Sequence, residues 1–221
     1  MDLLDLTKQV SASAVLDPST TATIKHRCTF HHYCCDGIDD KNWGCGYRTL
    51  QSLCSWAVGQ VAITTSVPSV RDIQQILVEV GDKSKSHVGS RDWIGTYEAC
   101  MVMDHLYWVC GSILNMMDAL RMIACRIIHM PQGASILDQL PVLSAHFTEN
   151  GSPVMIGGDV DGASKTLLGV STHPPLFLIA DPHYVGPSDK DIVIASGFIK
   201  WHGPELFQTS SFYNFCLPLS N

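Results

Sequence analysis

The sequence lacks the features by which proteins bind nucleic acid or enter a membrane. Its 14 Lys and Arg residues are outnumbered by 21 Asp and Glu residues, the net charge is −7, and no basic cluster occurs. A phosphate backbone is bound by such clusters, so we expect no nucleic-acid partner. No apolar run approaches the roughly 20 residues of a membrane-spanning helix, and the acidic residues 1–6 do not resemble a secretion signal. We therefore expect a cytoplasmic protein with no direct membrane insertion.

A disulfide framework and the usual zinc-ligand spacing are also missing. The nine cysteines are an odd number, and no two are separated by just two residues. Cys34 and Cys35 are adjacent, so on a strand they would point in opposite directions and could hardly bind one ion. We expect reduced thiols, no metal and no cofactor. Four cysteines in apolar stretches are expected to be small buried hydrophobic residues: Cys100, Cys110, Cys125 and Cys216.

The composition indicates one globular domain that follows a short arm. Hydrophobic residues make up 46% and charged residues 16% of the 221 residues, which excludes a disordered chain. Residues 1–27 are rich in Ser, Thr and Ala and are interrupted by Pro18, so we predict a weakly ordered N-terminal arm. Residues 28–221 form the predicted domain.

Helices are predicted in the first half of this domain and strands in the second. Apolar spacing and capping residues predict helices over 45–58, 69–80, 90–107 and 135–147, the last with a kink at Pro141. Short apolar runs bounded by Gly, Pro and Asp predict buried strands at 154–156, 166–170, 176–180 and 192–194. Helices followed by strands favour an α+β domain over alternating βαβ units.

Cys45 is the strongest candidate for a nucleophile. It lies between Gly44 and Gly46, where the first predicted helix begins. A helix N-terminus and a neighbouring imidazolium both lower the pKa of a thiol, and the thiolate is the nucleophilic form. We expect the flanking glycines to let a substrate backbone approach closely.

A base and the group that orients it are found in Asp181-Pro182-His183, directly after an apolar run. Residues two apart on an extended backbone face the same side, so Asp181 can hold one ring nitrogen of His183 and leave the other for Cys45. Tyr33 could donate a hydrogen bond to an oxyanion. Taken singly, the cysteine is also compatible with a structural residue, the D-P-H segment with a turn, and Tyr33 with a core aromatic residue.

Around these residues the chain resembles the cysteine proteases specific for the ubiquitin-fold modifier, in the short form that lacks a long N-terminal extension. The matching segments occur in the family's order and span most of the chain. They are residues 33–56, containing N-W-G-C-G-Y-R-T-L-Q, then 90–95 (S-R-D-W-I-G), 153–159 (P-V-M-I-G-G-D), 164–170 (S-K-T-L-L-G-V), 181–186 (D-P-H-Y-V-G) and 211–217 (S-F-Y-N-F-C-L).

The resemblance implies a papain-like catalytic domain, with a helical first half packed on a mostly antiparallel sheet from the second half. It implies Cys45 as nucleophile, His183 as base, Asp181 as its orienting acid and Tyr33 as oxyanion donor. The partner it implies is the ubiquitin-fold modifier, cut after its C-terminal glycine during precursor maturation or release from lysines.

Two alternatives and two secondary sites remain open. Autophagins share the W-G-C and D-P-H segments and also cut after a glycine, but G-Y-R-T-L-Q, S-R-D-W-I-G and the short length favour the first family. A non-catalytic modifier-binding module is the alternative from another class. Trp93 is predicted on a loop above the cleft, where Trp43 and Trp93 would bind the modifier tail. A buried aromatic residue at a helix start is the competing interpretation of Trp93.

Overall fold

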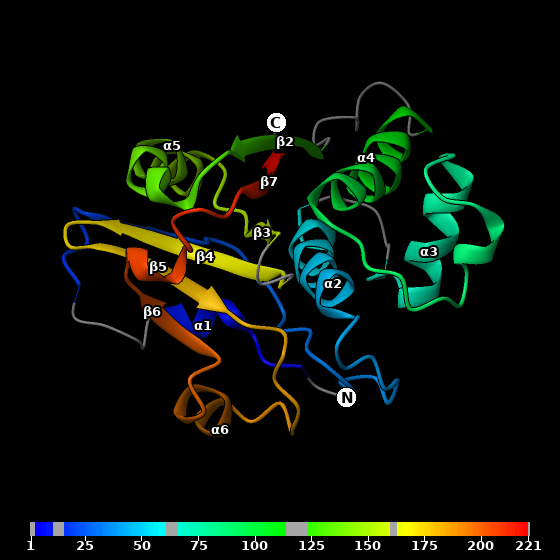
Figure 1. The fold of residues 1–221 in the computed structure, drawn as a ribbon, viewed down its shortest axis with the longest axis horizontal. Helices are drawn as coiled ribbons and strands as arrows, with labels where there is room; N and C mark the ends of the chain where they lie inside the picture. The colour runs from blue at the N-terminus through cyan, green and yellow to red at the C-terminus, as the bar shows by residue number, and fades with distance from the viewer. Residues whose placement is uncertain (1–2, 11–15, 61–65, 114–122, 160–162, 221) are drawn as a thin grey trace.

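A single antiparallel sheet organises the fold of this protein (Figure 1). The computed structural model describes residues 3–10, 16–60, 66–113, 123–159 and 163–220. Six strands run in the order β2-β7-β3-β4-β5-β6, and β1 pairs with β4. Their bounds are β1 Thr21–Thr23, β2 Ile123–Met130, β3 Val154–Gly158, β4 Lys165–Thr172, β5 Pro175–Ala180, β6 Ile199–His202 and β7 Tyr213–Ser220.

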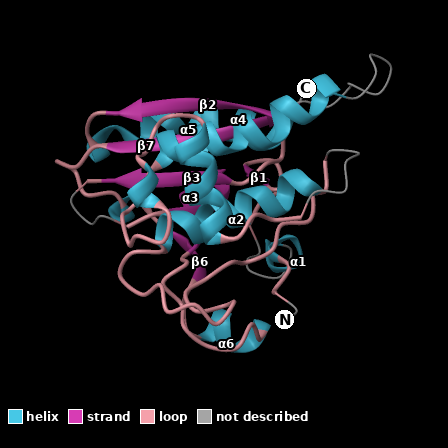
Figure 2. Ribbon diagram, turned by 90° about the vertical axis from the view of Figure 1, so that its right-hand side faces the viewer, coloured by secondary structure: helices cyan, strands magenta, loops and turns pink. Residues whose placement is uncertain are grey.

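Helices cover this sheet. Their bounds are α1 Leu6–Val10, α2 Cys45–Val58, α3 Val70–Glu79, α4 Thr96–Ile113, α5 Ile136–Glu149 and α6 Lys190–Ala195. Three short 3-10 turns are η1 Lys85–His87, η2 Gly133–Ser135 and η3 Pro204–Leu206. Figure 2 shows α2, α3 and α4 on one side of the strands. Within the described residues, no helix is long and apolar enough to cross a membrane.

The core lies where α2 meets the middle of the sheet. Helix α2 packs on β3 and β4, while α5 also packs on β4. Every residue of β4 from Thr166 to Ser171 is buried, so both faces of this strand are covered. The continuous apolar run of β4 follows from that position, since an alternating pattern requires one solvated face. The α+β arrangement of helices on an antiparallel sheet is confirmed.

Two of the predicted helices are found with the expected bounds and caps. Helix α2 begins at Cys45 and ends before Gly59. In α3, the Ser69 side chain accepts from the backbone N–H of Asp72, and the Asp72 carboxylate accepts from the backbone N–H of Ser69. This reciprocal pair is a capping box, as the spacing predicted. The chain then leaves α3 through Gly81, whose φ is +81°.

Two predictions of local structure were wrong. The helix expected from residue 90 begins at Thr96, because the Ser90 hydroxyl accepts from the backbone N–H of Asp92 in a turn, and Glu98 accepts from the backbone N–H of Gly95. The strand expected at 192–194 is part of α6. The Asp189 carboxylate caps that helix by accepting from two backbone N–H groups. A three-residue apolar run has too little periodicity to separate the two structures.

The first 27 residues contact the body of the domain over their described parts. Leu6 is fully buried, and its N–H donates to the carbonyl of Cys28 at 2.7 Å. Thr21–Thr23 form β1, which pairs antiparallel with β4 from Ser171 to Gly169. Leu6 and β1 thus pack against the domain, although the sequence predicted a weakly ordered arm over residues 1–27. Residues 1–2 and 11–15 lie outside the described part.

One face of α2 is polar, yet buried, because it binds the backbone of the segment 28–36. The Ser55 hydroxyl accepts from the N–H of Thr29, and the Ser52 hydroxyl accepts from the N–H of His31. The serines are three residues apart, so they lie on the same face of the helix. Side chains of α2 therefore satisfy backbone groups that a neighbouring strand would otherwise bind.

Arg48 completes this polar face one turn before Ser52. Its guanidinium makes two hydrogen bonds to the Asp36 carboxylate, at 2.7 and 2.8 Å, and its Nε donates to Asp40 at 2.6 Å. Arg48 and Asp40 are both fully buried. The other carboxylate oxygen of Asp40 accepts from the N–H of Cys34, and its carbonyl accepts from the N–H of Gly44. The loop 33–44 is thereby fixed at both ends to the start of α2.

Replacing this arginine is expected to destabilise the whole domain. Arg48→Met keeps most of the volume but leaves the Asp40 carboxylate buried without its cation, and breaking a buried ion pair costs about 3–5 kcal/mol. Urea unfolding should show a loss of that size. The exposed Arg71 of α3 supplies the matched control, Arg71→Met, with an expected change within about 0.5 kcal/mol. Equal effects of both variants would contradict a special role for the Arg48 network.

Candidate active site

Cys45 is the first residue of α2, and its side chain is only 5% exposed. The backbone N–H groups of the first turn of α2 provide the partial positive charge that favours a thiolate. The glycines beside Cys45 have packing roles. A Cβ on Gly44 would lie 2.2 Å from an Asp40 carboxylate oxygen, and one on Gly46 would lie 2.3 Å from the carbonyl oxygen of Ile94. The two glycines therefore let the protein's own loops approach the nucleophile.

His183 and Asp181 follow β5 and form the pair that the sequence predicted. The Nδ1 of His183 is 2.5 Å from Oδ1 of Asp181, and the same oxygen accepts from the backbone N–H of His183 at 3.1 Å. Asp181 is itself held by its backbone N–H, which donates to the carbonyl of Phe198. The other ring nitrogen of His183 is left for the thiol of Cys45, with which His183 forms a hydrogen bond.

The charges of this group favour a thiolate and an imidazolium. Burial opposes ionisation of Cys45, but hydrogen bonds from His183, from the backbone of Ser164 and from Tyr33 outweigh it and lower the pKa of the thiol. The Asp181 carboxylate, followed by Cys45, raises the pKa of His183 to about 9. Burial would raise the pKa of Asp181, but its hydrogen bonds with His183 lower it instead. Cys45 and His183 thus stabilise each other's charged forms.

Tyr33 lies beside both catalytic candidates. Its ring meets that of His183 edge to face, with centroids 5.1 Å apart, and its hydroxyl is hydrogen-bonded to Cys45. Burial, then the nearby Cys45, raise the pKa of the phenol, so the hydroxyl keeps its proton and can donate it in a hydrogen bond. The backbone N–H of Tyr33 donates to the carbonyl of Pro182 at 2.9 Å. The structure therefore brings Cys45, His183, Asp181 and Tyr33 together.

Sequence reasoning missed the backbone N–H of Ser164, which hydrogen-bonds to the Cys45 sulfur. Ser164 opens the segment S-K-T-L-L-G-V directly before β4. The donor is a main-chain group, which every residue except proline has, so the amino-acid type at position 164 does not predict it. Only the placement of β4 against the start of α2 could have identified this donor.

Trp93 and Trp43 lie on neighbouring loops near the nucleophile. Trp93 is 59% exposed, and its indole N–H donates to the carbonyl of Asn42 at 3.2 Å. A buried aromatic residue at a helix start is therefore excluded. Trp43 is half-buried, packs edge to face on Tyr47 and lines a cavity of about 240 Å³ together with Ile38, Val70 and Arg91. Binding of a substrate tail by the two tryptophans stays a prediction.

Comparison with known proteins agrees with this geometry. Residues 19–216 match the profile described as Peptidase family C78. The chain is 40% identical over 205 residues to "Ufm1-specific protease 1" of Mus musculus, which covers 90% of this chain and 87% of that protein. It is 41% identical over 193 residues to "Ufm1-specific protease 2" of Homo sapiens, covering 86% of this chain but only 38% of that longer protein.

A solved structure confirms the fold. The crystal structure of UfSP from C. elegans superposes with a TM-score of 0.80 at 31% identity and covers 99% of this chain and 38% of that one. The papain-like α+β fold expected from the motifs is therefore present. A family match over most of the chain, together with a thiol and an imidazole held by a carboxylate, supports one conclusion: the chain belongs to peptidase family C78.

Proposed function

We propose that this chain is a thiol protease that cleaves after the C-terminal glycine of Ufm1, the ubiquitin-fold modifier. The reaction would mature the Ufm1 precursor, release Ufm1 from lysines of conjugated proteins, or both. The observation that carries the proposal is the grouping of Cys45, His183 and Asp181 at the N-terminus of α2. The names of the similar proteases, which refer to Ufm1, supply the substrate.

The arrangement of the site suggests the sequence of steps. The Cys45 thiolate attacks the carbonyl carbon of the terminal glycine, and the negative charge moves to the carbonyl oxygen. Tyr33 donates a hydrogen bond to that oxygen. The imidazolium of His183 then gives its proton to the leaving amine, and a thioester remains on Cys45. Water attacks the thioester as His183 takes a proton from the water. Cys45 leaves as a thiolate, which restores the thiolate–imidazolium pair, and the released glycine acid loses its proton to solvent.

Trp93 and Trp43 would bind the extended tail on its way to Cys45. The loop of Trp93 contacts the nucleophile's helix directly, since the carbonyl of Ile94 faces Gly46. Large side chains next to the scissile glycine would collide with such walls. The folded body of the modifier would supply further binding energy outside the cleft, which can help to orient the scissile bond.

Two alternatives concern the substrate and the turnover. An autophagin-like protease would act on a different ubiquitin-like protein, and a non-catalytic module would bind the modifier without cutting it. The hydrogen bonds between Cys45, His183 and Asp181 favour an active enzyme over the module. We also propose a reducing compartment such as the cytoplasm, because the eight described cysteines are free thiols.

A panel of modifier precursors would test this proposal. Ufm1, ubiquitin and an autophagy-type modifier, each with a C-terminal extension, are incubated with the protein, and trimming is followed by mass spectrometry. We expect Ufm1 alone to be trimmed, and Cys45→Ser to bind it without cutting. A short peptide that copies only the tail should be a poor substrate. If another modifier were trimmed in preference to Ufm1, the proposed substrate would be wrong. If Cys45→Ser still cleaved the precursor, Cys45 would not be the nucleophile.

Asp181→Asn should lower the fraction of Cys45 that is thiolate in the protein without substrate. The amide keeps the size of the carboxylate but can donate a hydrogen bond, which favours the wrong tautomer of His183 and withdraws the charge that stabilises the imidazolium. Less Cys45 is then thiolate at neutral pH, so alkylation by iodoacetamide should slow relative to the unaltered protein. Unchanged alkylation would show that Asp181 does not control the ionisation of Cys45.

Tyr33→Phe should instead slow a later step, the formation of the tetrahedral intermediate. The Tyr33 hydroxyl meets charge that appears only on the tetrahedral oxygen, and loss of one oxyanion donor typically costs ~100- to 1,000-fold in kcat. We expect a fall of up to that size with KM nearly unchanged. Iodoacetamide reactivity should change less than in Asp181→Asn, although the phenol also hydrogen-bonds to the Cys45 sulfur. Nearly normal cleavage would mean that backbone N–H groups near Cys45 stabilise the oxyanion without Tyr33.

A further inference from the structure

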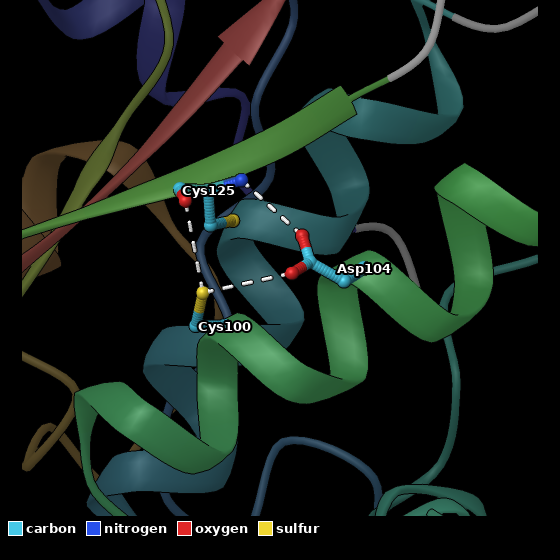
Figure 3. A group of neighbouring side chains, drawn as sticks. All are labelled: Cys100, Asp104 and Cys125. Carbon is cyan, nitrogen blue, oxygen red and sulfur yellow. Dashed lines mark hydrogen bonds between the residues drawn. The ribbon is translucent and has the colours of Figure 1, made fainter.

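Two cysteines and one aspartate meet where α4 packs on β2, outside the catalytic group. Figure 3 shows Cys100 and Asp104 on α4 facing Cys125 on β2. One sulfur or carboxylate oxygen from each of these residues lies within 4.8 Å of the other two. Cys216, on the neighbouring strand β7, is buried and is not part of this group.

The fold places these residues together from two separate elements of the chain. Cys100 and Asp104 are four residues apart, so they share the face of α4 that packs on β2 and β7. Cys125 is on β2, which packs directly on α4. The three side chains therefore meet between helix and sheet.

We propose that Cys100, Cys125 and Asp104 form a zinc site. Two thiolates and one carboxylate oxygen are ligands that Zn²⁺ accepts in a four-coordinate, tetrahedral arrangement, with water in the fourth position. With zinc–ligand distances of about 2.0–2.3 Å, neighbouring ligand atoms in a tetrahedron are roughly 3.5–3.8 Å apart. The Cys100 sulfur is 3.9 Å from Oδ2 of Asp104, close to that separation already. On binding, each thiol would release its proton to solvent.

The surroundings orient the ligands as a metal site requires. The backbone N–H of Cys125 donates to Oδ1 of Asp104 at 3.2 Å, which leaves Oδ2 directed at the sulfur of Cys100. Such hydrogen bonds behind a ligand fix its orientation. Cys100, Asp104 and Cys125 are only partly buried, so an ion can reach them from solvent. Cys28, in contrast, is fully buried and its sulfur bonds to the Ser52 carbonyl and the Ser55 hydroxyl.

The carboxylate separates zinc from two other uses of clustered thiols. Copper(I) prefers sulfur ligands alone, so it would leave Asp104 without a role. A disulfide between two of the cysteines would also leave Asp104 unused, and would require an oxidant such as hydrogen peroxide. A bound zinc ion would connect α4 to β2 and so stabilise the contact between the helical layer and one end of the sheet. The cysteine spacing in the sequence gave no indication of such a site.

Cobalt(II) titration of the full chain would test the proposal, with Cys45→Ser as the background so that the catalytic thiol cannot bind metal. We expect about one metal ion per chain, with the near-ultraviolet charge-transfer absorption of cobalt–thiolate bonds and the visible bands of tetrahedral cobalt. Zinc should displace the cobalt and raise Tm in a concentration-dependent way.

Three further variants in this background separate the outcomes. Cys100→Ser should weaken zinc binding by more than about 100-fold. Loss of a residue that only hydrogen-bonds to a metal ligand already costs about 10- to 100-fold in affinity, and Cys100 is a ligand itself. Asp104→Asn keeps an oxygen that can accept from Cys125 and should lose affinity while the Tm of the metal-free protein stays nearly unchanged. Cys28→Ser is the matched control and should bind like its parent. Absence of the charge-transfer absorption, its survival in Cys100→Ser, or a mass about 2 Da lower from a disulfide would each overturn the proposal.

Discussion

The buried guanidinium of Arg48 is the interaction on which the arrangement of the catalytic group depends. It binds two carboxylates of the loop 33–44 from the first turns of α2. That loop carries Tyr33 at its beginning and Trp43 at its end, and the helix carries Cys45. A fully buried charge must be paired. If the loop moved away from the helix, Arg48 or Asp40 would have to become exposed to solvent or stay buried without its partner. Electrostatics therefore hold Tyr33 and Cys45 in one unit.

The proposed base, His183, comes from a different part of the fold. Asp181 and His183 follow β5, whose position is set by its pairing with β4 and β6. A backbone hydrogen bond from Tyr33 to the carbonyl of Pro182 connects the loop of the helical half to the segment of the sheet. Sheet pairing thus fixes the direction of the imidazole, and one main-chain bond sets its lateral position beside the phenol.

Local signals in the sequence were sufficient for the parts of the site that rest on neighbouring residues. The start of α2 at Cys45, the capping box of α3 and the Asp181–His183 pair each depend on residues within three or four positions. The N–H of Ser164 could not be predicted, because its role depends on how β4 meets α2. The same limit applies to Asp189, whose capping of α6 competed with an apolar run typical of a strand, and to the meeting of Cys100 with Cys125 across the α4–β2 contact.

The close approach of Gly46 to the carbonyl of Ile94 has a mechanical consequence. Since there is no room for even one additional carbon atom at this contact, the loop that carries Trp93 lies directly against the first turn of α2. Any side chain at position 46 would have to displace the loop, the helix end or both, and would so change the distance between the exposed indole and the sulfur of Cys45.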